Sequence, residues 1–177
     1  MLVYHAAFLA LVAGTTLFFA YLAALNVRYA EDAVRERADW LAYRIGVDDP
    51  EELLAYHRLT TAASQLESVV VLAVVLLALY AGVFAGAVEF VYDTIANDLL
   101  AGVALFVGSV LALQLVSLPF DAFNTFAIED AYGFNEQSPG LFVRDKLVGS
   151  VVAAAFVAIL GGAVLYTVQA FPEWWWL

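Results

Sequence analysis

The residue types that do chemistry in proteins are scarce in this sequence. The chain has two histidines, His5 and His57, and no cysteine, which excludes disulfides, thiolate zinc sites and cysteine nucleophiles. The two histidines are too far apart for a His-x-x-x-His zinc pair, and neither occurs in a visible Ser–His arrangement. Gly133, Gly140 and Gly149 lack the spacing of a phosphate-binding loop. The sequence therefore predicts no catalytic residue and no metal ligand within this chain.

Two polar side chains stand out because they adjoin or interrupt long apolar runs. Glu67 stands at the head of the second run, and Gln114 lies within the third. A carboxylate near lipid is costly unless it is paired. Glu67 is therefore either a member of a structural pair or a neighbour of a working site. We take Glu67 and Gln114 as candidate intramembrane polar residues.

Composition indicates that lipid surrounds most of this chain. Of its 177 residues, 64% are hydrophobic and 14% are charged, with a mean hydropathy of +0.87. Soluble domains have about 45–50% apolar and about 25% charged residues. The net charge of −11 argues against nucleic acid as a partner, because phosphates need Lys and Arg. Such acidity is unusual for a membrane protein and indicates a high-salt cytoplasm, as in a haloarchaeon.

Four apolar runs are long enough to cross a bilayer as helices, which takes roughly 20 residues. No charge precedes the first run, whereas three arginines follow it, so it is expected to be an uncleaved span rather than a signal peptide. The Trp triplet near the end predicts the start of a fifth span, and with it an N-terminal piece of a longer protein; the alternative is an aromatic anchor. The predicted fold is an all-α, polytopic transmembrane helical bundle, with spans at about 4–25, 69–88, 99–120 and 147–171.

The basic residues predict the orientation of these spans. All seven fall in two loops, 26–68 and 121–146, which the positive-inside rule makes cytoplasmic, with the N-terminus outside; they are Arg28, Arg35, Arg37, Arg44, Arg58, Arg144 and Lys146. The first loop is expected to hold two cytoplasmic amphipathic helices. In one of them, Glu31 and Arg35 have the spacing of an i,i+4 ion pair. The other is expected to begin with Asp49 as N-cap and Pro50 at its first position.

Glycine and proline predict local features of the spans. Gly82 and Gly86 have the small-xxx-small spacing that lets helices approach closely, and Gly161 with Gly162 is expected either to do the same or to loosen its helix. Pro119 is expected to distort or end the third span.

The segment between the third and fourth spans, 118–147, differs from the rest of the chain. It is rich in phenylalanine, turn residues and paired charges, and a plain connector has no need of such apolar rings. Gly133 is expected to occupy a demanding backbone position, and Ser138 with Pro139 to open the next helix. The residues of interest are Pro119, Phe120, Thr125, Glu129, Gly133, Phe134, Asn135, Phe142, Asp145 and Lys146.

These residues carry a resemblance. The segment is similar to the N-terminal membrane region of the type I CAAX prenyl endopeptidases, which are integral-membrane zinc metalloproteases. The matching blocks are Leu118-Pro119-Phe120, Thr125-Phe126, Ile128-Glu129, Gly133-Phe134-Asn135, Leu141-Phe142 and Asp145-Lys146, with Gln65-Leu66-Glu67-Ser68 before the second span. The Ile-Glu…Gly-Phe-Asn block is specific, whereas the apolar remainder matches many membrane proteins.

The resemblance implies a protease whose zinc site lies near the cytoplasmic face of the membrane. The family's His-Glu-x-x-His motif is absent from this chain, so zinc is expected in a missing catalytic part and this chain is expected to be inactive alone. The implied role is one wall of an intramembrane chamber that braces the catalytic domain. The implied partners are the bilayer, the C-terminal zinc metalloprotease domain and a peptide or prenylated peptide. The first alternative is a stand-alone, non-catalytic membrane protein or degenerate paralogue that acts as an interaction partner. The second is a small transporter or channel subunit, which the few charges in the spans support less well.

Overall fold

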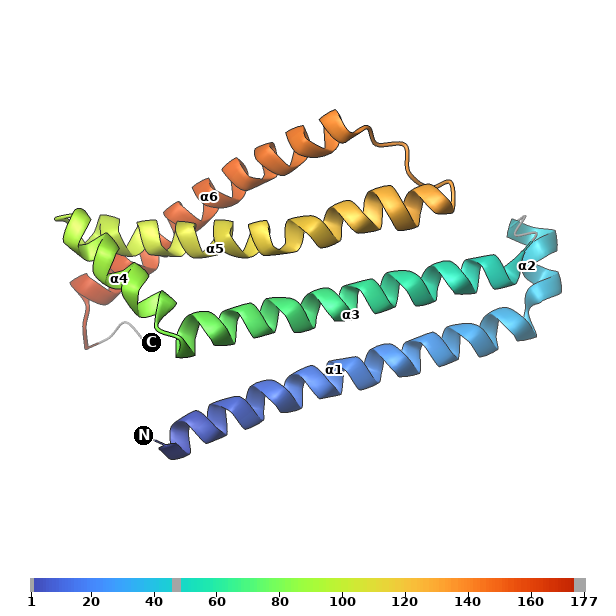
Figure 1. The fold of residues 1–177 in the computed structure, drawn as a ribbon, viewed down its shortest axis with the longest axis horizontal. Coiled ribbons are helices and arrows are strands. Elements are labelled where there is room, and N and C mark those ends of the chain that lie inside the picture. Colours follow the sequence, from blue (N-terminus) through green and yellow to red (C-terminus); the bar gives the residue numbers. More distant parts are fainter. Residues whose placement is uncertain (1, 46–48, 174–177) are drawn as a thin grey trace. The chain divides into compact units, whose positions relative to one another are not determined.

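The computed structural model describes residues 2–45 and 49–173, and within them it is helical without a strand. The apolar runs account for this, because a backbone in lipid must satisfy its own hydrogen bonds. Four of the helices are long and apolar enough to cross a membrane. Figure 1 shows the elements, which are α1 (Leu2–Glu36), α2 (Ala38–Ile45), α3 (Pro50–Tyr80), α4 (Val83–Thr94), α5 (Asp98–Phe123), the π-helix η1 (Asn124–Glu129) and α6 (Pro139–Ala170).

The chain divides into two compact units. The first comprises Met1–Val69 and Phe123–Phe134, and the second comprises Val70–Ala122 and Asn135–Leu177. One predicted feature lies outside the described residues: the expected start of a fifth span at Trp174 to Trp176.

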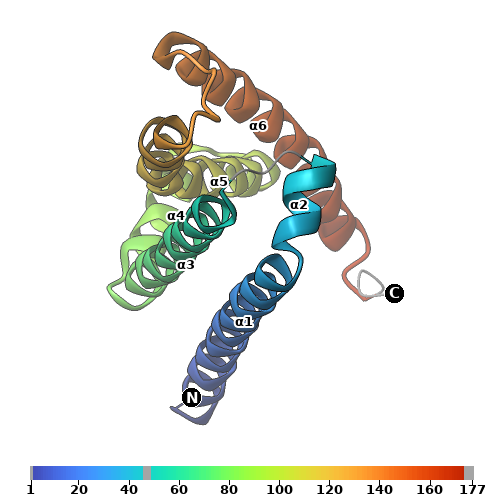
Figure 2. The same cartoon turned by 90° about the vertical axis from the view of Figure 1, so that its right-hand side faces the viewer.

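In the first unit, α1 and the beginning of α3 run side by side in opposite directions (Figures 1 and 2). At Arg37 the chain leaves the axis of α1 and turns into the short helix α2, so the predicted amphipathic segment 30–44 belongs to two helices. The start of α3 confirms the predicted cap: Asp49 Oδ1 accepts the backbone N–H groups of Glu51 and Glu52, at 2.9 and 3.2 Å. Leu54 and Ile128 are the buried apolar residues of this unit.

The second predicted span, 69–88, differs from the observed helices. The helix α3 ends at Tyr80, and a separate helix, α4, begins at Val83. Between them Gly82 has φ 80°, a left-handed conformation that glycine adopts without the steric cost of a Cβ. Gly82 therefore turns the chain. Neither Gly82 nor Gly86 has a described atom within 4 Å of the place where a Cβ would be, so no close helix contact is seen at either.

In the second unit, α5 and α6 approach closely where glycine replaces a side chain. A Cβ on Gly102 would lie 2.7 Å from Leu165 Cδ1, and one on Gly161 would lie 2.7 Å from Phe106 Cδ2. A Cβ on Gly162 would lie 3.4 Å from Val103 Cγ2. The close-approach role expected of Gly161 and Gly162 is confirmed. Gly102, which is buried, makes the reciprocal contact and was not predicted.

Pro119 does not end the third span. The helix α5 continues through it to Phe123 and then widens into η1, so that the continuous helical segment runs from Asp98 to Glu129. Proline lacks an N–H, so the carbonyl of Leu115 loses its usual donor one turn earlier. Long membrane helices tolerate this loss, and the helix continues for more than two turns beyond the proline.

Candidate functional site

The segment after η1 ends in a glycine-capped turn within the first unit. Gly133 has φ 69°, which confirms the demanding backbone position expected of it. The N–H of Phe134 donates to the carbonyl of Glu129 at 2.8 Å, and the N–H of Gly133 donates to Asp130 at 3.2 Å. This nested pair of bonds defines a Schellman motif, in which a left-handed glycine ends the helix. The Gly-Phe-Asn block of the sequence is therefore a rigid helix stop.

Aromatic rings hold this turn against α3. The ring of Tyr56 meets Tyr132 and Phe134 edge-on, with centroid distances of 5.3 and 4.9 Å. Such pairs contribute about 0.5–1.5 kcal/mol each beyond area burial. Phe134 nevertheless keeps 59% of its surface exposed, so much of its ring remains available to another surface. Within η1, Asn124 Nδ2 donates to Glu129 Oε1 at 3.4 Å.

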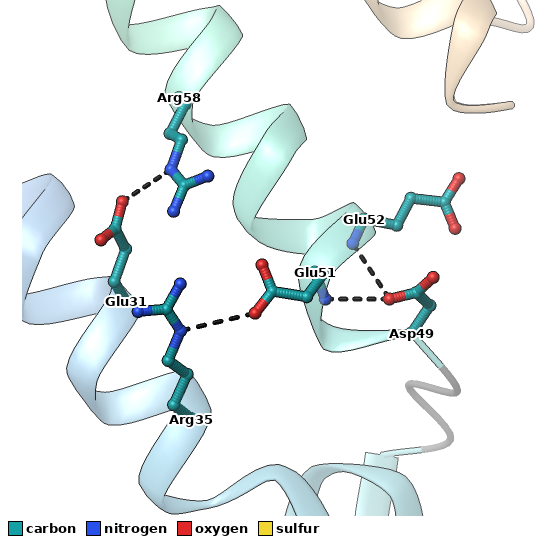
Figure 3. A network of polar contacts seen from close by, with 6 residues as sticks. All are labelled: Glu31, Arg35, Asp49, Glu51, Glu52 and Arg58. Carbon is teal, nitrogen blue, oxygen red and sulfur yellow. Dashed lines mark hydrogen bonds and ion pairs between the residues drawn. The ribbon is translucent and has the colours of Figure 1, made fainter.

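Two ion pairs join α1 to α3 in the same unit (Figure 3). Arg58 Nε lies 2.6 Å from Glu31 Oε1, and Arg35 Nε lies 3.4 Å from Glu51 Oε1. The i,i+4 pairing expected between Glu31 and Arg35 is wrong, because each charge pairs across the helices instead. The side chains of both pairs are exposed or partly exposed to solvent, so these pairs add little to stability. Their main value is that they define the register of the two helices.

Beyond the turn, in the second unit, short polar contacts start α6. Asn135 Oδ1 accepts the N–H of Gln137 at 2.7 Å, and Ser138 Oγ accepts the N–H of Leu141 at 3.3 Å. Ser138 is thus the N-cap of α6 and Pro139 occupies the first turn, as predicted. Gln137 Nε2 also donates to Asp145 Oδ2 at 2.9 Å.

Polar side chains connect α5 to α6 along the second unit. Lys146 Nζ donates to Asp121 Oδ2 at 2.5 Å and lies 5.4 Å from the centroid of the buried Phe142 ring. Farther along, Ser150 Oγ donates to Gln114 Oε1 at 2.7 Å. Gln114 is therefore a partnered polar residue between helices, the usual solution for an amide at membrane depth.

A cavity of about 810 Å³ lies between these two helices. Its walls are mainly apolar, and the groups that give it polarity are Gln114, Ser117, Asp121, Asp145, Lys146 and Ser150. Apolar walls with a few polar groups suit the binding of an amphiphilic molecule. Within residues 2–45 and 49–173, no three His, Asp or Glu side chains are grouped to hold a metal ion. The described residues therefore do not fit a zinc site, and no chemical step is assigned to zinc here.

The structure brings together only part of the predicted set. Glu129, Gly133 and Phe134 meet at the turn, whereas Phe142, Asp145, Lys146 and Gln114 line or adjoin the cavity. Phe120 and Thr125 are half-buried, and Pro119 is exposed. Sequence reasoning missed Tyr56, Asp121 and Ser150. Their partners lie 25 or more residues away, and no local pattern reports such pairs.

Comparison with known proteins decides the family. The family model described as CAAX prenyl protease N-terminal, five membrane helices, matches residues 36–177, well over half of the chain. The chain belongs to this family. Similar curated proteins include a CAAX prenyl protease 1 homolog of Arabidopsis thaliana, which is 30% identical over 73 residues. These residues are 41% of this chain and 17% of the relative. That of Caenorhabditis elegans is 38% identical over 64 residues, 36% of this chain and 14% of the relative.

The human CAAX prenyl protease 1 homolog is 33% identical over 61 residues, which are 34% of this chain and 13% of the relative. The matches thus cover less than a fifth of the length of the curated relatives. No solved structure matches the chain. The family confirms the resemblance read from Leu118-Pro119-Phe120 and the Gly-Phe-Asn block, and it makes the chain a multi-pass membrane domain.

Proposed function

We propose that this chain is the membrane half of a CAAX prenyl protease-like zinc metalloendopeptidase. Its helices form part of an intramembrane chamber, and its η1–Gly133 turn braces a cytoplasmic catalytic domain. That domain supplies the His-Glu-x-x-His zinc ligands, which this sequence lacks. A peptide or prenylated peptide is the substrate.

The single observation that carries the bracing role is the capped turn with its exposed ring. Two Schellman bonds fix the turn and the ring contact with Tyr56 holds Phe134, yet more than half of the surface of Phe134 is exposed. An apolar side chain that is held in place and left uncovered is available for contact with another protein domain. The distribution of basic residues supports a cytoplasmic position for this loop, so the expected partner is the catalytic domain.

Reconstitution tests the proposal. The chain is embedded in proteoliposomes with and without the catalytic part, joined in one polypeptide or added as a separate one, and given a farnesylated and an unprenylated peptide. Zinc content and cleavage are both measured. We expect cleavage only in the assembled protein, with zinc in the same sample. Equal cleavage by the catalytic part without this chain would exclude the proposed role. Stable capture of a partner without zinc ligands would support the stand-alone interaction protein instead.

A further inference from the structure

Residues 57–68, in the middle of α3, carry their polar side chains other than Arg58 on one face. At 100° per residue, all the uncharged polar residues of this stretch, its histidine and its single acid fall within an arc of about 160°. They are His57, Thr60, Thr61, Ser64, Gln65, Glu67 and Ser68. Leu59, Leu66 and Val69 occupy the opposite side, where they are 48, 58 and 53% exposed. The stretch is thus amphipathic, with an apolar face suited to lipid and a polar face turned away from it.

The ion pairs of Figure 3 place this polar face at membrane depth. Glu31 is level with Arg58, and Arg35 is level with Glu51. Because the two helices are antiparallel, a position one residue earlier in α1 lies level with a position one residue later in α3. Each residue advances by about 1.5 Å along the helix axis. Leu25, the last residue of the apolar run of α1, is therefore level with Thr61 to Ser64. Glu67 lies about 4–9 Å farther toward the middle of that run.

Gln65 and Glu67, which belong to this face, need polar neighbours at that depth. Thr60 Oγ donates to the carbonyls of Tyr56 and His57, and Ser68 Oγ donates to that of Ser64, so both hydroxyls are satisfied by their own helix. Gln65 and Glu67 have no hydrogen-bond partner among the residues that the structure describes, and both are half-buried. An amide and a carboxylate in hydrocarbon would be costly, which makes water the expected neighbour.

We propose that this face of α3 is a hydrated wall at membrane depth, and that Glu67 makes it selective for cationic groups. This inference rests on the proposed function, because the hydrated face of α3 would be one wall of the proposed chamber. A carboxylate that is the only charge on such a wall attracts a positive group and repels a negative one. The surface therefore favours basic side chains of a peptide over acidic ones.

Cysteine labelling tests this inference, because the chain has no cysteine of its own. The full chain in proteoliposomes carries Ser64→Cys, Ser68→Cys or, as the matched control on the opposite face at the same depth, Leu66→Cys. Each is treated with a cationic (trimethylammonium) or an anionic (sulfonate) methanethiosulfonate. We expect the two serine positions to react about tenfold faster than Leu66→Cys, because a thiol facing lipid scarcely ionises. We expect the cationic reagent to be favoured, and Glu67→Gln to lower that preference by about three- to tenfold.

Each outcome decides a part of the inference. If both serine positions react as slowly as Leu66→Cys, the face is dry and the inference is wrong. If Leu66→Cys reacts as fast as the serine positions, the segment lies outside the membrane and the depth assignment is wrong. An unchanged reagent preference in Glu67→Gln removes the electrostatic role. Labelling needs no peptidase activity, so these failures are distinct from a failure of the proposed function.

Discussion

Lys146 Nζ of α6 lies 2.5 Å from Asp121 Oδ2 of α5, and this contact keeps the register of the whole helix pair. Phe106 of α5 lies against Gly161 of α6. Gly102, four residues earlier in α5, lies against Leu165, four residues later in α6. The same antiparallel register brings Gln114 to Ser150. The glycine contacts, the hydrogen bond between Gln114 and Ser150 and the ion pair therefore all fit one alignment of α5 with α6.

The ion pair predicts a coupled loss of stability. Its two side chains are 42 and 36% exposed, so the interaction is expected to contribute about 0.5–1 kcal/mol. Asp121→Asn and Lys146→Gln should each lower the thermal midpoint in detergent, and the double variant should lose less than the two single losses together. Strict additivity in this double-mutant cycle would show that the pair contributes nothing.

The glycine contact at Gly161 predicts a steric penalty. Gly161→Val forces a side chain into the space of Phe106, which should cost about 1–3 kcal/mol of stability. Phe106→Ala in the same chain should restore part of that loss by vacating the space. Gly86→Val is the matched control, because no described atom lies within 4 Å of that position. Thermal unfolding of the four proteins measures the effect; an equal loss in both valine variants would contradict it.

The left-handed glycine of the turn predicts a backbone penalty. Gly133→Ala should cost about 1–2 kcal/mol, because an L-residue at φ 69° brings its Cβ against the backbone. Gly133→Asn should cost less, since asparagine tolerates this region best. Gly140→Ala, in the first turn of α6 with open space around it, is the control and should be close to neutral. Proteolysis of the 130–138 segment in native membranes gives a local readout.

The bracing role predicts a larger effect on activity than on stability. Phe134→Ala, Glu129→Ala and Asn135→Ala in the assembled protease should each lower peptide cleavage. For Phe134→Ala in particular, the free energy of unfolding should fall by no more than the about 0.5–1.5 kcal/mol of its ring contact with Tyr56. Leu66→Ala, another exposed apolar residue, serves as the control and should leave cleavage unchanged. Full activity of all three loop variants would end the bracing proposal.

The proposed orientation predicts the accessibility of two loops. Tags placed beside Arg35 and beside Phe134 should report the same, cytoplasmic, side of the bilayer, while a tag at the N-terminus reports the other side. Protease protection in sealed vesicles measures this. Tags at Arg35 and Phe134 on opposite sides would refute the orientation and, with it, the placing of the turn beside a cytoplasmic domain.

Local signals in the sequence predicted the local features of the fold. Apolar length predicted membrane helices, Asp49-Pro50 predicted the start of α3, and Gly133 predicted its turn. The sequence did not predict the break at Gly82, because glycine is also common within continuous membrane helices. Only its φ of 80° distinguishes the break from a continuous helix. Of the two effects expected of Pro119, an end of the helix is not observed, because its neighbours keep the helix intact.

Contacts between distant residues were beyond the reach of such signals. The partner of Asp121 is 25 residues away and that of Gln114 is 36 residues away. Glu31 has an arginine at the ideal local spacing and pairs instead with Arg58, 27 residues away. The sequence alone shows that a charge or an amide needs a partner. The register of the helices decides which partner it contacts.

The widened turn η1 has an evolutionary consequence. A π-turn holds one residue more than an α-turn, so this segment takes up an extra residue without breaking the helix. Removing one residue from Asn124–Glu129 would return the segment to ordinary winding. Because the extra residue is taken up locally, the turn that follows would keep its direction and Phe134 would stay close to Tyr56. A single-codon deletion here should therefore do less damage than one in an α-helical stretch, where every later residue rotates by about 100°.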